Sequence, residues 1–176
     1  MKRKKCKLLI AACVVAISIS SFGLSRKNEA KASSKPNAVD TNKKAKLTIS
    51  KAELDVVAEK IFKNEAGGKK DELVYWNSGE DFPSLGIGHF IWYKQGQKGR
   101  FEESFPPLVE YYKARNVKLP RIMEENKYSP WQSRDELFRL KNSGNKDVAE
   151  LTDFLYNTKD IQVSFIFERL ENSLEK

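Results

Sequence analysis

The folded part of this chain cannot contain a disulfide bond, because both of its cysteines lie near the N-terminus. Cys6 and Cys13 are the only cysteines among 176 residues, and both fall within a leader that we expect to be removed. The remainder then has no disulfide, no thiol nucleophile and no thiolate ligand for a metal. Its stability must come from a hydrophobic core.

Residues 1–32 have the three parts of a secretory signal peptide. Five basic residues occur among the first seven, an apolar run covers residues 8–24, and Ala30-Lys31-Ala32 is a small-x-small cleavage pattern. The alternative is a retained membrane anchor, but the run is at the short end of what spans a bilayer. A lipoprotein signal at Cys13 is disfavoured because the apolar run continues beyond it. We therefore expect a secreted or extracytoplasmic protein, with no membrane contact after signal cleavage.

The net charge of +8 does not point to a nucleic-acid partner. Residues 1–32 carry eight of the 32 basic residues and one of the 24 acidic ones, so the rest of the chain is near +1. Nucleic-acid binding needs a concentrated basic surface. Residues 50–176 hold 20 bases and 22 acids, which provides none in bulk.

The composition divides the remainder into two parts. Residues 33–48 are rich in Lys, Ser, Asn and Ala and are typical of a flexible linker. Residues 49–176 have globular patterning, a normal size for one domain and no internal repeat. The sequence leaves the oligomeric state open.

The periodicity predicts an α+β domain that is mostly helical, with a small β-hairpin region after the first helix. Ser50 and Glu53 form a capping box, and apolar residues then recur at helical spacing until Asn64 or Glu65, before Gly67-Gly68. Short strands and turns are expected between Leu73 and Tyr93. Further helices are expected at four places: after Pro106-Pro107, after Ser133, from Asn145 or Lys146 to Tyr156, and after Thr158. At Ser133 the residues Ser133-Arg134-Asp135-Glu136 predict a second capping box.

Glu65 is a candidate general acid because it ends an amphipathic helix just before two glycines. A carboxyl group in that position can overhang a cleft, and apolar neighbours would favour its protonated form. From spacing alone, a solvated glutamate at a helix end is the simpler interpretation.

The segment from Trp76 to Tyr93 has the mixture of side chains found in sugar-binding clefts. Aromatic faces stack on pyranose rings, and polar groups hold the hydroxyls. The candidate substrate-binding residues are Trp76, Asn77, Ser78, His89, Trp92 and Tyr93. The three aromatic residues could equally be core, and for His89 a structural role, with its ring bonded to backbone or a carboxylate, is the simpler interpretation. A phosphate site at Gly86-Ile87-Gly88 is weak, because the full dinucleotide fingerprint is absent.

Two other classes of site are disfavoured. His89 is the only histidine, so we expect no histidine-based metal site and no cofactor. A serine hydrolase is also disfavoured, because no Gly-x-Ser-x-Gly elbow is present.

The helix ending in Asn64-Glu65, the polar Gly-rich loop and the run Ser84-Leu85-Gly86-Ile87-Gly88-His89 resemble the start of phage-type lysozymes (endolysins). The resemblance covers residues 61–90. It implies a lysozyme-like domain in which Glu65 takes the place of the family's catalytic acid, and Ser84 and His89 take the places of its Thr and His.

The loop before Ser84 is about four residues longer than in that family. Ser78 therefore stands where the family has an Asp or Cys. Glu80 or Asp81 is then the candidate second carboxylate.

The resemblance implies a secreted glycoside hydrolase that cleaves peptidoglycan glycan strands. Glu65 would protonate the glycosidic oxygen. Glu80 or Asp81 would stabilise positive charge at the anomeric carbon, act as nucleophile or orient water, depending on the distance between the two carboxylates. Ser84 would help to hold the attacking water. Two alternatives remain: a non-catalytic cell-wall glycan-binding module, and an exported structural or partner-binding domain on the same fold.

Overall fold

Helix α1 (Lys51–Glu65) begins and ends where the sequence predicts. In the computed structural model, which describes residues 49–174, the Ser50 hydroxyl accepts the backbone N–H of Glu53 at 3.3 Å. The Glu53 carboxylate in turn accepts the backbone N–H of Ser50 at 2.8 Å. This capping box satisfies two of the donors left free at a helix N-terminus. The expectations for residues 1–32 and for the linker, residues 33–48, fall outside the described residues.

The predicted α+β class is confirmed: helices dominate, and a small antiparallel sheet follows the first helix. The described part contains the 3-10 helix η1 (Lys70–Leu73), strands β1 (Val74–Tyr75), β2 (Ser84–Leu85) and β3 (Phe90–Ile91), and helices α2 (Phe105–Ala114), α3 (Arg121–Glu125), α4 (Arg134–Asn142), α5 (Lys146–Asn157) and α6 (Lys159–Leu174). The sequence did not predict η1 or α3.

Local side-chain caps fix two of the later helices. Ser133 accepts the backbone N–H of Glu136 at the start of α4, as its sequence pattern predicts. The Glu136 carboxylate, however, accepts the N–H of Gln132 at 2.7 Å. Asn145 caps α5 by accepting the N–H of Val148 at 3.2 Å. These caps set the helix starts independently of the rest of the fold.

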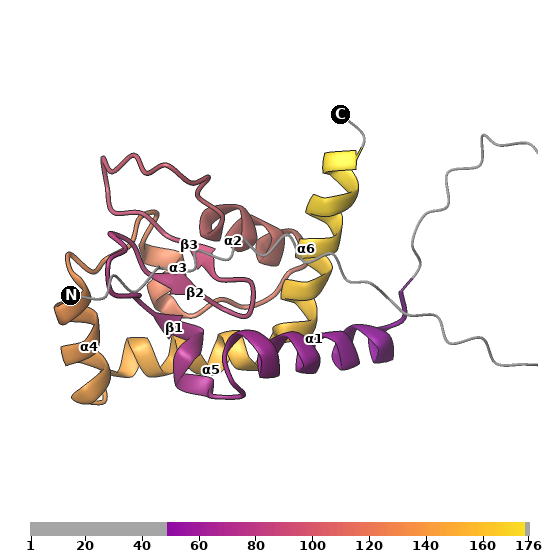
Figure 1. Ribbon diagram of the computed structural model, residues 1–176, viewed down its shortest axis with the longest axis horizontal. Coiled ribbons are helices and arrows are strands. Elements are labelled where there is room, and N and C mark those ends of the chain that lie inside the picture. Colours follow the sequence, from indigo (N-terminus) through magenta and orange to yellow (C-terminus); the bar gives the residue numbers. More distant parts are fainter. Residues whose placement is uncertain (1–48, 175–176) are drawn as a thin grey trace, which may run out of the picture. The chain divides into compact units, whose positions relative to one another are not determined.

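The three strands form one antiparallel sheet in the order β1-β2-β3. Ser84 on the central strand lies opposite Tyr75 on one side and Ile91 on the other. Strand β1 contacts α5 and strand β3 contacts α2, so the sheet lies between these two helices (Figure 1). Two-residue strands are too short to be stable alone, so the sheet depends on its helical surroundings.

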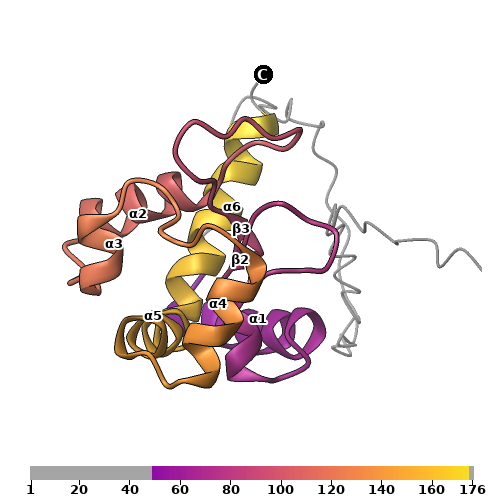
Figure 2. The same ribbon diagram turned by 90° about the vertical axis from the view of Figure 1, so that its left-hand side faces the viewer.

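Helix α6 connects the two sides of the domain. It packs along α1 and also contacts α2, and it rises past the sheet in both views (Figures 1 and 2). The core between these elements is rich in aromatic residues. Trp92 is 1% exposed, and its ring centre lies 4.7 Å from that of Phe105 and 5.9 Å from that of Trp131. No helix between residues 49 and 174 is long and apolar enough to cross a membrane.

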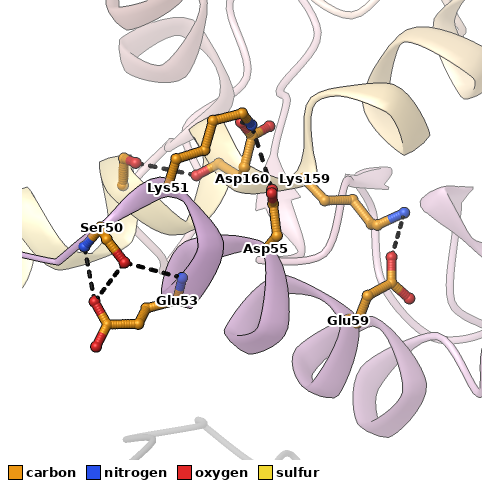
Figure 3. Close-up of polar contacts among 8 residues, drawn as sticks. Ser50, Lys51, Glu53, Asp55, Glu59, Lys159 and Asp160 are labelled. Carbon is orange, nitrogen blue, oxygen red and sulfur yellow. Dashed lines mark hydrogen bonds and ion pairs between the residues drawn. The ribbon is translucent and has the colours of Figure 1, made fainter.

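Ion pairs join α1 to the start of α6 (Figure 3). The Lys51 ammonium lies 2.8 Å from the Asp160 carboxylate. Lys159 lies 2.9 Å from Glu59, and its side chain is only 10% exposed. The Lys159 ammonium also lies 3.5 Å from the ring centre of Tyr156. Exposed pairs add little to stability, so the shielded Lys159 contacts matter more for this junction.

A single buried amide joins α6 to the turn between β2 and β3. Gln162 is fully buried, and its Oε1 accepts the backbone N–H of Ile87 at 2.9 Å. A Cβ atom on Gly86 would lie only 2.2 Å from that oxygen. Gly86 also has a φ of +68°. Glycine adopts this region freely, whereas residues with a side chain, apart from Asn and Asp, rarely do. Both the backbone conformation and the space therefore require glycine here.

We predict that Gly86→Ala lowers the free energy of unfolding by about 2–4 kcal/mol. About 1 kcal/mol comes from the left-handed backbone, and the rest comes from displacing Gln162 and leaving buried groups unpaired. The matched control is Gly144→Ala, since Gly144 has a φ of +69° but open space around its Cβ position. The measurement is urea unfolding of both variants. Equal losses in the two variants would contradict the role given to Gln162.

Candidate functional site

Four of the residues that the sequence singles out line one cleft beside the sheet. The cleft has a volume of about 260 Å³. Its lining comes from the end of α1, from η1, from β1 and β2 and from the turn before β3, and consists of Glu65, Glu72, Tyr75, Asn77, Ser84, Gly86 and His89. The predicted general acid, the predicted water-holding serine and two predicted substrate-binding residues are thus brought together from separate segments.

Glu65 reaches the cleft because the chain turns sharply after α1. The backbone N–H groups of Ala66 and Gly68 both bond to the carbonyl of Phe62, at 3.0 and 3.3 Å. Gly67 and Gly68 then take left-handed φ values of +56° and +70°, as expected of residues that end a helix. The Glu65 side chain is exposed, so the apolar surroundings that the sequence argument requires are not present here. A bound ligand would have to exclude water from this carboxyl group.

Ser84 and Asn77 are held in place by neighbouring backbone and side-chain contacts. Ser84 lies on the central strand and is 7% exposed. The Asn77 amide donates to the Glu80 carboxylate at 3.0 Å, and the Trp76 indole N–H donates to the Glu80 carbonyl at 2.8 Å. Glu80 therefore orients Asn77 rather than lining the cleft itself.

The other predicted polar residues lie outside the cleft lining. Ser78 and Asp81 are exposed and are not among the residues that line the cleft. The Asp81 carbonyl accepts the side-chain amide of Gln97 at 2.9 Å, which directs this part of the loop toward the β3–α2 connection. Of the acids proposed from the sequence, only Glu65 lines the cleft.

The three aromatic candidates belong to the core. Trp76, Trp92 and Tyr93 are 3%, 1% and 4% exposed, so the core alternative applies and they do not form walls for a sugar. The Tyr93 hydroxyl donates to the carbonyl of Phe101 at 3.2 Å. Burial raises the pKa of this phenol, which is consistent with a structural position.

For His89 the structure differs from the interpretation that the sequence favours. Its ring is exposed and lines the cleft, and within the described residues neither ring nitrogen has a hydrogen-bond partner. Its φ of +48° is left-handed, and its backbone N–H bonds to the Gly86 carbonyl at 3.4 Å. The turn therefore presents the imidazole to the cleft instead of burying it as a structural group.

Sequence reasoning missed two cleft residues, Glu72 and Tyr75. Glu72 lies in η1, within a run of charged residues that is typical of a solvated surface. Tyr75 lies on β1, where a strand pattern gives no sign of a site. Within the described residues, no group of three or more His, Asp or Glu side chains is placed to hold a metal ion.

Lys141 of α4 holds the segment that carries these two residues. Its ammonium donates to the carbonyls of Asp71 and Val74, the latter at 2.7 Å. The Val74 carbonyl lies at the C-terminal end of η1, where a positive charge is favourable, and the Asp71 carbonyl lies one residue before Glu72. Burial lowers the pKa of Lys141, while the carboxylates of Asp71 and Glu72 act in the opposite direction. The backbone on both sides of Glu72 is thus fixed from a distant helix.

A second hollow, of about 250 Å³, lies between α1 and the start of α6, but its charged groups are already paired. Asp55 and Asp160 both contact Lys51, at 3.4 and 2.8 Å. Glu59 pairs with Lys159 (Figure 3). In the cleft, by contrast, neither Glu65 nor Glu72 forms an ion pair with another residue in the described range. The cleft is therefore the better candidate site, because no residue between 49 and 174 forms an ion pair with its acids.

We predict that Lys141→Met lowers the free energy of unfolding by about 1–2 kcal/mol, because two charge-assisted hydrogen bonds are lost while the aliphatic stem is kept. Hydrogen exchange should also increase at the backbone of residues 70–75. Lys118→Met is the control, since Lys118 is exposed in the loop before α3. Unchanged hydrogen exchange in residues 70–75 of the Lys141 variant would contradict the conclusion that Lys141 holds this segment in place.

Comparisons with known proteins leave the site to be interpreted from its own geometry. The chain matches no family model, no curated protein and no solved structure.

Proposed function

We propose that this chain is a glycoside hydrolase that cleaves the glycan strands of peptidoglycan, with Glu65 as its general acid. The proposal includes a lysozyme-like domain and a site of action outside the cytoplasm, as the leader in residues 1–32 leads us to expect. The observation that carries it is the convergence of Glu65, Ser84 and His89 on one cleft. Fold class alone would not support a function, but these three positions are the ones that the resemblance to phage-type lysozymes indicates.

The lining of the cleft suits a sugar chain. Tyr75 offers a half-buried aromatic ring, and the Asn77 amide and the Ser84 hydroxyl can hydrogen-bond to sugar hydroxyls and amides. Among residues 49–174, no Lys or Arg side chain lines the cleft, so these residues do not favour a phosphate or another strongly anionic group. A neutral glycan segment fits this set of groups best.

In the proposed reaction Glu65 donates a proton to the glycosidic oxygen as the bond to the anomeric carbon breaks. A water molecule attacks that carbon, and Ser84 is placed to hold it. The glycan itself would cover Glu65 and exclude solvent, which strengthens the interaction of a carboxyl group with the developing charge. Proton donation of this kind is worth about 10²–10⁴ in rate.

A second candidate function is a binding module that holds a wall glycan without cutting it. The exposure of Glu65 favours this reading, because an acid without apolar neighbours resembles an ordinary surface glutamate. The position of Glu80, which bonds to Asn77, favours it too, since one of the proposed second carboxylates is already engaged.

We predict that the full chain releases reducing ends from purified peptidoglycan and that Glu65→Gln lowers the rate by about 10²–10⁴-fold. The substitution keeps the size of the side chain and removes its transferable proton, so folding should be unchanged. Glu150→Gln, on an exposed face of α5, is the control. Saturable binding to peptidoglycan by both the wild-type chain and Glu65→Gln, with no release by either, would instead establish the binding module.

A further inference from the structure

We propose that Glu72 is the second carboxylate of the cleft, in place of Glu80 or Asp81. This inference rests on the proposed function and assigns the group that works opposite Glu65. Glu72 and Glu65 are the two acidic residues that line the cleft. They reach it from different elements, η1 and the end of α1.

The backbone around Glu72 is held more firmly than an exposed charged segment would be. Its N–H bonds to the carbonyl of Lys69 at 3.1 Å, and the carbonyl of the next residue, Leu73, accepts the N–H of Gly86 at 2.7 Å. Leu73 itself is fully buried. Together with the bonds from Lys141 to the carbonyls of Asp71 and Val74, these contacts fix the backbone that carries Glu72 next to the turn between β2 and β3. A catalytic group needs this kind of fixed geometry.

The Glu72 side chain is also available for chemistry. It is half-buried and forms no ion pair with another residue between 49 and 174. The basic residue nearest in η1, Lys70, is paired with Asp153 at 2.6 Å. Lys141 directs its hydrogen bonds to backbone carbonyls. A half-buried acid that lines a cleft and forms no ion pair within the described residues is one of the polar groups that can hold a ligand.

Glu80 and Asp81, the alternatives that the sequence offers, do not combine a place in the cleft lining with a carboxylate that is available to a ligand. One carboxylate oxygen of Glu80 already accepts a hydrogen bond from the Asn77 amide. Asp81 is exposed and is not among the residues that line the cleft. Asp71, the neighbour of Glu72 in η1, is exposed and also outside the lining. The choice of Glu72 thus follows from position, not from charge alone.

The assigned role completes the proton balance of hydrolysis. As Glu65 gives its proton to the departing sugar oxygen, a water oxygen bonds to the anomeric carbon and Glu72 takes the released proton. Glu65 leaves the step ionised and Glu72 leaves it protonated, and exchange with solvent restores both. This is the general acid and general base pair of an inverting glycosidase.

The test uses the full chain on purified peptidoglycan, with three substitutions that keep side-chain size. Glu72→Gln should lower the release of reducing ends by about 10²–10⁴-fold, with unchanged circular dichroism. Asp71→Asn, the adjacent acid in the same 3-10 helix, should leave the rate unchanged. Asp81→Asn tests the competing assignment and should also leave it unchanged.

A chemical rescue separates a catalytic role from a structural one. In Glu72→Ala, added azide can attack the anomeric carbon without needing a base, so sodium azide should restore turnover. Mass spectrometry should then detect a glycosyl azide. A substitution that only loosens the fold would not respond to azide.

The outcomes distinguish this inference from the proposed function. Release by the wild-type chain, with Glu72→Gln within threefold of it or with no azide product from folded Glu72→Ala, would overturn the role of Glu72 and leave the hydrolase intact. Loss in Asp81→Asn alone would move the role to Asp81. No release by the folded wild-type chain would overturn both proposals.

Discussion

The cleft depends on one buried side chain, the amide of Gln162. The amide is fully buried and uses both of its ends: Oε1 accepts the N–H of Ile87 at 2.9 Å, and Nε2 donates to the carbonyl of Leu155 at 2.7 Å. A buried amide with unmet hydrogen bonds is costly, so the turn after β2 and the junction of α5 and α6 fix each other. Ser84 precedes this turn and His89 lies within it, and their positions follow from it.

Charged side chains of α4 support the opposite wall in the same way. Lys141 binds carbonyls at both ends of the Glu72 segment, and Arg134 donates from Nε to the carbonyl of Trp76 at 2.9 Å. The sheet has strands of two residues and cannot hold a fixed shape alone. Helices late in the chain therefore make this site rigid, although the residues that line it lie earlier in the sequence, between Glu65 and His89. The arrangement puts cleft residues on an irregular segment without leaving that segment free to move.

The parts of the fold that sequence could predict are those decided by neighbours along the chain. The Ser50 box and the Ser133 cap act within three residues, and both occur where their patterns indicate. Glu72 could not be found in this way, because its position depends on Lys141, about 70 residues later. The roles of Trp76, Trp92 and Tyr93 could not be decided from the sequence for a related reason. An aromatic side chain suits a hydrophobic core and a sugar-binding surface equally well, and only its burial in the folded protein distinguishes the two roles.

The left-handed backbone of His89 has a consequence for how this protein responds to selection. Glycine would adopt the φ of +48° without the strain of about 1 kcal/mol that a side chain brings there. The turn would thus be more stable without the imidazole that it presents to the cleft. At this position a gain in stability would therefore remove a side chain from the cleft. A screen that selects only for thermal resistance would replace the only histidine of the chain.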